Sequence, residues 1–267
     1  MDFGFQIAAC PGAKCVTARR HETHCKAYKP GLGQRFWINF KLILFQNPHS
    51  PFRIGFAMNL YLILFCIASY LLGSVPTGLV LAKLFSEKDI RQSGSGNIGA
   101  ANVTRVLGKK LGIITFLGDM LKGFLPVFIG SQIFQSLLPV VTLRFAVCAF
   151  GFAAFLGHLF SVYLKFRGGK GVATAFGIFL YLESIAIPIV VVLFILVIAV
   201  WRYVSLGSLV SAAAMPFVLI GLAYFVRPVS APALLLSIVI AFFIFLKHKS
   251  NIQRLLMGSE NKIGQKE

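Results

Sequence analysis

The sequence predicts an all-α integral membrane protein with seven transmembrane helices, an external N-terminus and a cytoplasmic C-terminus. Three observations support this fold class. The 267 residues are 57% hydrophobic with a mean hydropathy of +0.82, which is too apolar for an ordinary soluble domain. Their apolar runs reach the length needed to cross a bilayer, and basic residues gather in alternate connections between these runs.

Residues 1–57 are set apart from the rest of the chain. They carry eight basic residues and no apolar run of bilayer length, since the best stretch, 36–45, is short and contains Lys41. Met58 then begins an apolar helix. We therefore expect residues 1–57 to be either a disordered extension or a stretch upstream of the true start at Met58, followed by a membrane domain at 58–267.

Seven apolar segments of this domain are predicted to be helices. The fourth is short, and a turn at Glu183 and Ser184 separates it from the fifth. In order, the predicted spans are 59–84, 111–135, 141–164, 171–183, 185–201, 204–225 and 230–246.

The charges in the connections predict the orientation. One side carries fourteen Lys and Arg residues, and the other carries only Arg227 beyond the N-terminal region. Positive charge is retained on the cytoplasmic side, so the fourteen residues are placed in the cytoplasm. The formal net charge of +18 is thus typical of cytoplasmic loops, and no nucleic-acid partner is expected.

Three basic segments with glycine or polar residues fall on this predicted cytoplasmic side. Glycine lets backbone N–H groups approach an anion, and Lys, Arg, Ser and Asn add donors, so each segment suits phosphate. We expect the segments to form one anion pocket, with Ser95, Lys170 and Asn251 close together. They run over residues 93–105, 165–171 and 247–254.

Several chemistries are excluded. The six acidic residues after Met58 form no cluster, which excludes two-metal phosphoryl transfer and hydrolysis by paired acids. The turn at 168–171 lacks the spacing of an NTPase phosphate loop. His158 and His248 lack the Asp five residues later that would orient a histidine base. The five cysteines show no paired spacing, so we expect neither a disulfide framework nor a zinc site. We also expect no other metal and no cofactor.

Acyl transfer remains chemically feasible without a His–Asp pair if the acyl donor is already activated. The protein then supplies mainly position and charge stabilisation. An acyl phosphate is such a donor, and both its phosphate and a phosphorylated acceptor would need anion-binding segments.

Four motifs together resemble the bacterial acyl-phosphate:glycerol-3-phosphate acyltransferases over about residues 58–264. The resemblance implies transfer of a fatty acyl group from acyl phosphate to the 1-hydroxyl of glycerol 3-phosphate, giving lysophosphatidic acid and phosphate in the first step of phospholipid synthesis. It also implies a seven-helix protein of the bacterial inner membrane, surrounded by membrane lipids, with a cytoplasmic active site and functional coupling to an enzyme that forms acyl phosphate. The motifs are LGSVPTG at 72–78, SGNIGAANVTR at 95–105 with GKK at 108–110, GHLF at 157–160 with FRGGKGVAT at 166–174, and HKSNIQRLLMGSE at 248–260.

The same resemblance implies roles for individual residues. Ser95 and Arg105 are expected to bind phosphate, His248 and Asn251 to contact the glycerol hydroxyls, and Glu260 to be structural. The donor phosphate itself is expected to take the proton from the attacking hydroxyl. The further residues expected to bind substrate are Gly96, Asn97, Gly99, Asn102, Gly168, Gly169, Lys170, Gly171, Ser205 and Ser208. The chain departs from the common pattern at Ala101, where threonine is usual, and at Ser161, where proline is usual.

Some polar residues also have a structural interpretation. His158, near a helix end, is expected to be a hydrogen-bonded structural histidine. Ser205 and Ser208 either donate to phosphate or cap a helix. Asp119 and Lys122 are expected to form an i,i+3 ion pair, which is either structural or positions substrate.

Two other functions are alternatives. A transporter or flippase for a phosphorylated metabolite would also use basic glycine-containing loops, but it predicts charges on both faces and two related halves, and the sequence has neither. A structural, partner-binding membrane protein would leave three anion-suited segments unexplained.

Overall fold

The computed structural model describes residues 51–264 of the chain. The chain divides into two units, Met1–Leu60 and Tyr61–Glu267. Of the first unit, only residues 51–60 are described, and they form the first turns of a helix that begins at Pro51 rather than at Met58. The prediction for residues 1–57 therefore lies mostly outside the described residues.

The described part of the chain consists of helices and their connections, without a strand, which confirms the all-α class. Helices lie at all seven predicted positions. The elements are α2 (Pro51–Ser74), α3 (Thr77–Phe85), α4 (Ala100–Leu107), α5 (Lys109–Phe134), α6 (Val140–Leu159), η2 (Val162–Leu164), α7 (Val172–Leu182), α8 (Ala186–Trp201), α9 (Val204–Phe225), α10 (Ala231–Lys247) and α11 (Lys249–Leu256).

The first predicted span is two helices rather than one. Proline has no N–H and disfavours a helical conformation at the residue before it, so Pro76 separates α2 from α3. The break leaves the Val75 carbonyl oxygen without a helical partner, and Lys122 Nζ on α5 donates to it at 2.9 Å. The prediction of one continuous helix over 59–84 is therefore wrong at this point.

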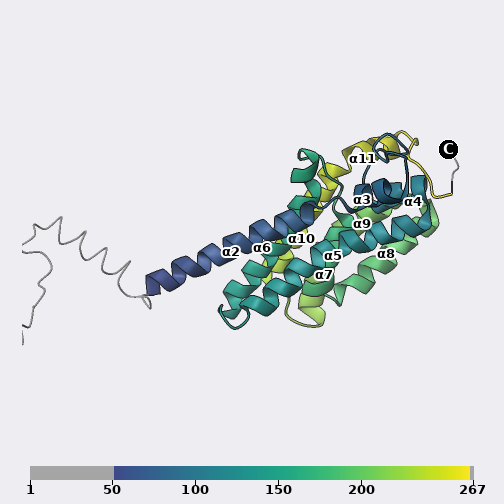
Figure 1. The fold of residues 1–267 in the computed structure, drawn as a ribbon. Helices are drawn as coiled ribbons and strands as arrows, with labels where there is room; N and C mark the ends of the chain where they lie inside the picture. The colour runs from purple at the N-terminus through teal and green to yellow at the C-terminus, as the bar shows by residue number, and fades with distance from the viewer. Residues whose placement is uncertain (1–50, 265–267) are drawn as a thin grey trace, which may run out of the picture. The chain divides into compact units, whose positions relative to one another are not determined.

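The other differences concern helix ends and short helices. The α-helix of the span predicted over 141–164 ends at Leu159, but η2 follows it, and the candidate membrane span Val140–Leu164 agrees with the prediction. Ser161, which stands where proline is usual, is buried, and its hydroxyl donates to the Ser74 carbonyl oxygen, so this departure ties the end of α6 to α2. Two basic segments treated as loops contain the short helices α4 and α11, and α11 is bent by 62° from α10. Figure 1 shows α3, α4 and α11 at the same end of the molecule.

Length and composition support at least four membrane spans in the described residues. Four helical segments are long and apolar enough to cross a membrane, and there are five if the bent pair α10–α11 is counted as one span. The apolar helices α7 and α8 are shorter. The 11 residues of α7 form a helix about 16 Å long, whereas the hydrocarbon core of a bilayer is about 30 Å thick. The chain is therefore a multi-pass membrane protein, while seven spans and the orientation of the termini stay predictions.

Close backbone contacts hold the helices that carry the site. A Cβ atom on Gly73 of α2 would collide with the Ala154 carbonyl of α6, and one on Gly123 of α5 would collide with the Thr174 carbonyl of α7. Glycine at these positions lets the helices approach more closely than any other residue would allow, which is how helices commonly associate in lipid. The α5–α7 contact places the start of α7 beside the middle of α5.

An ion pair joins the α7–α8 turn to the α9–α10 connection. Arg227 Nη2 lies 2.6 Å from Glu183 Oε2, and the Glu183 side chain is only 4% exposed. Burial raises the pKa of the Glu183 carboxyl, while Arg227 opposes this shift. The carboxylate thus depends on the arginine to stay ionised in its buried position.

Arg227→Met should lower the free energy of unfolding by about 1 to 2 kcal/mol, because it leaves a buried carboxylate without its cation. The estimate stays small since Arg227 is itself 37% exposed. An unpaired Glu183 is destabilising only when ionised, so the deficit should shrink as the pH is lowered and Glu183 is protonated. Thermal unfolding in detergent at pH 8 and pH 5 measures this, and an equal deficit at both pH values would contradict it. Glu183→Gln with Arg227→Met is the control that should restore most of the stability at pH 8.

Candidate functional site

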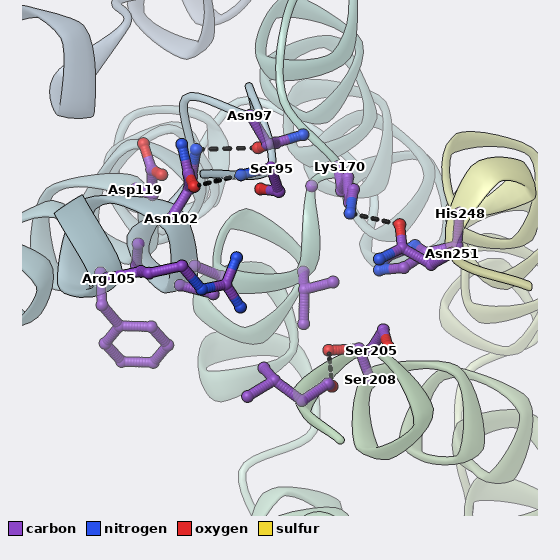
Figure 2. Close-up of a pocket in the computed structure, with 18 of the residues that line it drawn as sticks. Ser95, Asn97, Asn102, Arg105, Asp119, Lys170, Ser205, Ser208, His248 and Asn251 are labelled. Atoms are coloured by element: carbon purple, nitrogen blue, oxygen red, sulfur yellow. Dashed lines mark hydrogen bonds between the residues drawn. The ribbon is translucent and has the colours of Figure 1, made fainter. Parts of the chain in front are cut away.

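A polar pocket of about 190 Å³ lies where several helices begin. All three basic segments contribute to it, together with the start of α9 and residues 260–261. Ser95, Lys170 and Asn251 line the same pocket, so the predicted convergence of the segments is present in the structure. Figure 2 shows these side chains around the pocket, with Ser205 and Ser208 on a further wall.

Three helices direct their N-terminal ends at the pocket. The first two residues of α4, of α7 and of α9 all line it. The N–H groups of a first helical turn have no partner within the helix, and the helix dipole adds partial positive charge at this end. None of the three ends has a side-chain cap. The pocket is therefore suited to an anion by its backbone as well as by its side chains.

Asn102 organises the first wall. Its side chain is buried, its Oδ1 accepts from the Ser95 N–H at 2.8 Å, and its Nδ2 donates to the carbonyls of Ile90 and Ser93 at 2.9 and 3.1 Å. Asn97 Oδ1 likewise accepts from the Gly99 N–H at 2.8 Å. Both amides thus shape the loop. Because the backbone N–H groups of Ser95 and Gly99 are already paired, the donors that this loop offers a ligand are mainly side chains and the start of α4.

Arg105 and the Ser95 hydroxyl are the groups of this wall that face the pocket. Figure 2 shows the Arg105 guanidinium extended toward the pocket interior, with Lys170 on another wall. Within the described residues, Arg105 makes no hydrogen bond or ion pair. Its five N–H donors are therefore free for a ligand, and a guanidinium binds the oxygens of a phosphate in a bidentate manner.

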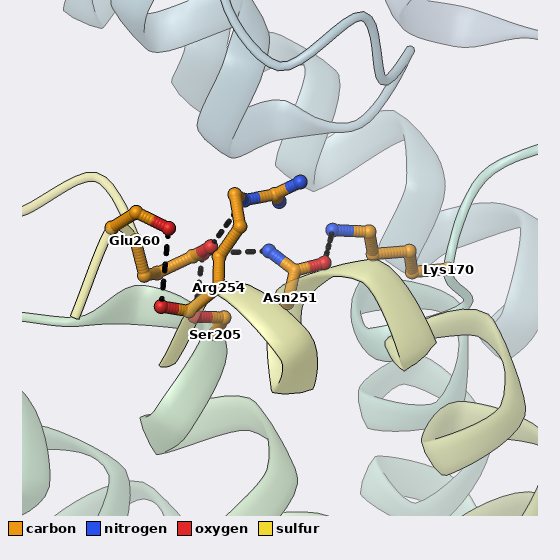
Figure 3. A network of polar contacts seen from close by, with 6 residues as sticks. Lys170, Ser205, Asn251, Arg254 and Glu260 are labelled. Carbon is orange, nitrogen blue, oxygen red and sulfur yellow. Dashed lines mark hydrogen bonds and ion pairs between the residues drawn. The ribbon is translucent and has the colours of Figure 1, made fainter. Parts of the chain in front are cut away.

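A polar network holds the opposite wall (Figure 3). Lys170 Nζ donates to Asn251 Oδ1, and Asn251 Nδ2 donates to Glu260 Oε1 at 2.6 Å. Glu260 also accepts from the Ser205 hydroxyl at 2.8 Å and from Arg254 Nε at 2.7 Å. The carboxylate therefore joins α9, α11 and the C-terminal segment, while the structural role expected for Glu260 stays a prediction.

Burial and neighbouring charges set the protonation of this network. Burial lowers the pKa of the Lys170 ammonium to about 8; nearby Glu260 opposes the shift, while Arg254 and Arg105 add to it. Burial also opposes ionisation of Glu260, but hydrogen bonds from Asn251 and its other donors outweigh this and keep the pKa of that carboxyl below its usual value. The network thus keeps the Glu260 carboxylate ionised, and Lys170 loses its proton at a lower pH than a solvent-exposed lysine does.

His248 is a neutral histidine in the pocket wall. Its ring is buried, and Nδ1 lies 2.8 Å from the Ile244 carbonyl oxygen. A carbonyl can only accept, so the proton is assigned to Nδ1 and Nε2 keeps its lone pair. Burial first, and then the charge of Lys170, lowers the pKa of His248 to about 4. His248 therefore offers a hydrogen-bond acceptor to a ligand in the pocket.

Three glycines expected to bind substrate do not line the pocket. The Gly168 N–H donates to the Leu159 carbonyl at 3.2 Å and the Gly169 N–H to the His158 carbonyl at 3.0 Å, so these groups satisfy the end of α6. The Gly96 N–H donates to Ser93 in a turn where its φ is +67°. Gly171 does line the pocket, as the N-cap of α7. The assignment of Gly96, Gly168 and Gly169 as ligand contacts is therefore corrected.

The two serines of α9 both line the pocket, but neither caps the helix. The Ser205 hydroxyl donates to Glu260 and the Ser208 hydroxyl to the Val204 carbonyl at 2.9 Å. The capping interpretation is therefore wrong, and contact with a phosphate stays a prediction.

Buried polar residues form the rear of the pocket. Lys122 Nζ lies 2.9 Å from Asp119 Oδ1, which confirms the predicted ion pair. His158 Nδ1 lies 3.7 Å from the same oxygen and makes no hydrogen bond within the described residues, contrary to expectation. In this part of the chain, no three His, Cys, Asp or Glu side chains are close enough together to hold a metal ion.

An apolar cavity of about 450 Å³ adjoins the polar pocket. The two share Phe116, Val172, Phe194 and Ser208 in their walls. The cavity runs between α5, α7, α8, α9 and α10 and is lined almost entirely by apolar side chains. A ligand with a charged head and a hydrocarbon chain would fit the two spaces together.

Sequence reasoning missed this cavity and several pocket residues. Phe116, Phe194 and Arg254 line the pocket without having been named as site residues. Arg254 follows Asn251 by one helical turn, which places both on one face of a helix, but that signal required recognising α11. No local pattern marks the two phenylalanines among the 27 of the chain.

Comparisons with known proteins agree on one family. The family model for glycerol-3-phosphate acyltransferase matches residues 63–258. A glycerol-3-phosphate acyltransferase of Trichlorobacter lovleyi is 48% identical over 200 residues, covering 74% of this chain and 96% of that protein. One from Syntrophotalea carbinolica is 50% identical over 197 residues, covering 73% and 94%.

Two solved structures are also similar. Both are crystal structures of PlsY (YgiH), an integral membrane glycerol 3-phosphate acyltransferase. The glycerol 3-phosphate form matches with a TM-score of 0.69 at 37% identity, and the lysphosphatidic acid form with 0.67 at 36%. Each match covers 76% of this chain and 96% of the solved chain.

Proposed function

This chain belongs to the glycerol-3-phosphate acyltransferase family, and we propose that it transfers a fatty acyl group from acyl phosphate to the 1-hydroxyl of glycerol 3-phosphate. The products are lysophosphatidic acid and inorganic phosphate, and the reaction begins phospholipid synthesis. The observation that carries this proposal is the shared wall between a polar, anion-suited pocket and an apolar cavity of fatty-acyl dimensions.

The chemistry follows from the donors around the pocket. The 1-hydroxyl oxygen forms a bond to the acyl carbonyl carbon, and the bond from this carbon to the phosphate oxygen breaks. The departing phosphate takes the hydroxyl proton. Arg105, Ser95 and the helix N-termini stabilise the negative charge on the phosphate as it leaves. Metal and cofactor chemistry is not part of this mechanism.

His248 and Asn251 orient the acceptor. With its pKa near 4, His248 is a weak base, so its Nε2 is better suited to accept a hydrogen bond from a glycerol hydroxyl than to remove a proton. Asn251 is held by Lys170 and Glu260 and presents its amide from the same wall. Lys170 supplies the cation for a substrate phosphate. Holding the hydroxyl beside the acyl carbon supplies much of the rate acceleration.

Membrane placement completes the proposal. The end of the protein that holds the three basic segments and the pocket lies at the cytoplasmic side of the bacterial inner membrane. The chain crosses this membrane seven times and has an external N-terminus. The charge bias of the connections supports this orientation. Acyl phosphate is a reactive substrate, so an enzyme that forms it works in sequence with this chain.

The direct test is a reaction with purified protein in detergent, palmitoyl phosphate and glycerol 3-phosphate. We expect lysolipid and phosphate to appear in a one-to-one ratio, with the acyl group at the 1-position. Palmitoyl coenzyme A replaces palmitoyl phosphate in a parallel reaction and should give no lysolipid. Lysolipid from the coenzyme A ester alone would refute the proposed donor, and no product from either would refute the acyltransferase activity.

The activity should fall as the pH is raised through about 8. Lys170 binds phosphate when protonated, and its lowered pKa means that this charge is lost near pH 8 rather than near 10.5. The phosphate of the substrate is already a dianion above pH 7. We expect kcat/KM for glycerol 3-phosphate to decline with one proton above pH 8. Lys170→Arg, which stays charged, should lack this decline, and a decline that persists in the variant would exclude Lys170 as its source.

A further inference from the structure

Charged and polar side chains are buried behind the pocket. Burying such groups among the apolar helices of a membrane protein costs free energy. Asp119 and Lys122 on α5 are 2% and 5% exposed, and they form an ion pair. Lys122 also satisfies the Val75 carbonyl at the break between α2 and α3. Acidic and basic side chains buried among membrane-spanning helices commonly pair with one another or belong to a functional site. Pairing accounts for Lys122, whereas the contact of Asp119 with His158 has no evident structural purpose.

The His158 ring lies between Asp119 and Gly169. Its Nδ1 is 3.7 Å from Asp119 Oδ1, which is beyond hydrogen-bonding distance, so the carboxylate lies beside the ring without binding it directly. On its other side, Nε2 is the atom that a Cβ on Gly169 would meet first, and the collision would also involve two ring carbons. The imidazole therefore touches the backbone of Gly169 directly.

Residue 158 thus supports the turn in two ways. Its carbonyl accepts from the Gly169 N–H at 3.0 Å, and its ring packs against the Gly169 Cα. The next residue is Lys170, whose ammonium reaches across the pocket to Asn251. A shift of the ring would move Gly169 and, with it, the ammonium of Lys170.

We propose that His158, through the contact of its ring with Gly169, is a positioning residue that sets where Lys170 places its charge, and that position 169 must be glycine because of this imidazole rather than because of substrate. The proposal rests on the proposed function insofar as Lys170 binds a substrate phosphate. His158 does not exchange a proton with the substrate in this scheme.

A double-mutant rescue tests the contact. Gly169→Ala should lower kcat/KM for glycerol 3-phosphate by about 100-fold, because the new methyl group displaces the turn. His158→Ala removes the ring that the methyl group strikes. Gly169→Ala with His158→Ala should therefore recover at least about tenfold over Gly169→Ala alone. A double variant no more active than Gly169→Ala would overturn the proposal.

Gly168 is the matched control. The three atoms nearest to a Cβ on Gly168 would be the carbonyl oxygen of residue 158 and two backbone atoms of Leu159, and none of these is a ring atom. His158→Ala should therefore leave the defect of Gly168→Ala unrelieved. Equal rescue at both positions would show that loss of the ring merely loosens the turn, which contradicts a specific contact.

A second cycle tests the path through Lys170. His158→Ala should raise KM for glycerol 3-phosphate about tenfold with a smaller change in kcat, and it should add little to the defect of Lys170→Met, since the positioned charge is then already absent. Additive losses would assign His158 a role separate from Lys170.

Thermal unfolding of the Gly169 and His158 variants reports the same rescue without catalysis. Absence of activity in the unmodified protein would therefore refute the proposed function, while absence of thermal rescue would refute this contact.

Discussion

Lys170→Met should lower kcat/KM for glycerol 3-phosphate by about 10- to 150-fold. A charge-assisted hydrogen bond to a phosphate is worth about 1.5 to 3 kcal/mol, and methionine keeps the length of the side chain while removing the charge. The substitution also leaves Asn251 Oδ1 without its donor, so the acceptor-orienting wall loses part of its order. Steady-state kinetics at pH 7, where Lys170 is protonated in the unmodified protein, measure the loss.

Lys249 provides the control for net charge. It lies in the third basic segment, is exposed and does not line the pocket. Lys249→Met removes the same charge from the same end of the molecule and should change kcat/KM less than about twofold, since exposed charges interact weakly through water. Equal losses in the two variants would indicate a general electrostatic attraction of the substrate, and normal kinetics in Lys170→Met would exclude a phosphate contact.

Ala212→Phe should lower the activity with long acyl donors far more than the activity with short ones. Ala212 lines the apolar cavity, so an aromatic ring at this position occupies space that the proposed acyl chain needs. Each buried methylene contributes about 0.8 kcal/mol, so exclusion of four methylenes costs about 3 kcal/mol, or about 150-fold in kcat/KM. Palmitoyl phosphate should suffer this loss, whereas octanoyl phosphate should lose less than about tenfold because it does not fill the cavity.

Ala223 on the same helix provides the matched control. It is exposed and does not line the cavity, so Ala223→Phe should leave the ratio of palmitoyl to octanoyl activity unchanged. If Ala212→Phe reduced both donors equally, the effect would be a general disturbance of α9. If it reduced neither, the acyl chain would lie elsewhere.

The positions of the apolar helices were predictable because hydropathy is a local property of the chain. The span predicted over 204–225 agrees with α9, and the turn at Glu183 and Ser184 separates α7 from α8. The first span failed at Pro76, although proline itself is visible in the sequence. At the break, the Val75 carbonyl accepts from the Thr77 N–H and from Lys122 Nζ, and the second contact joins residues 47 positions apart.

The chemistry of the site was partly predictable for the same reason. Lysine, arginine and serine in basic segments indicate an anion whatever their surroundings, and Ser95, Arg105 and Lys170 do line one pocket. Gly168 and Gly169 were misassigned because a backbone N–H is open to a ligand only if no other group accepts from it. Their acceptors lie at the end of α6, whose position relative to the turn depends on the packing of the helices.

Residue type and hydropathy can be read from each segment without knowledge of the others. They were enough to predict a helical membrane protein with anion-binding segments between its apolar runs. Three-dimensional packing established which donors remain for a ligand, as in the contact of Lys170 with Asn251, 81 residues apart. It also joined the polar pocket to an apolar cavity built from five helices. Such features depend on distances between segments remote in the chain, and no local pattern of residues encodes those distances.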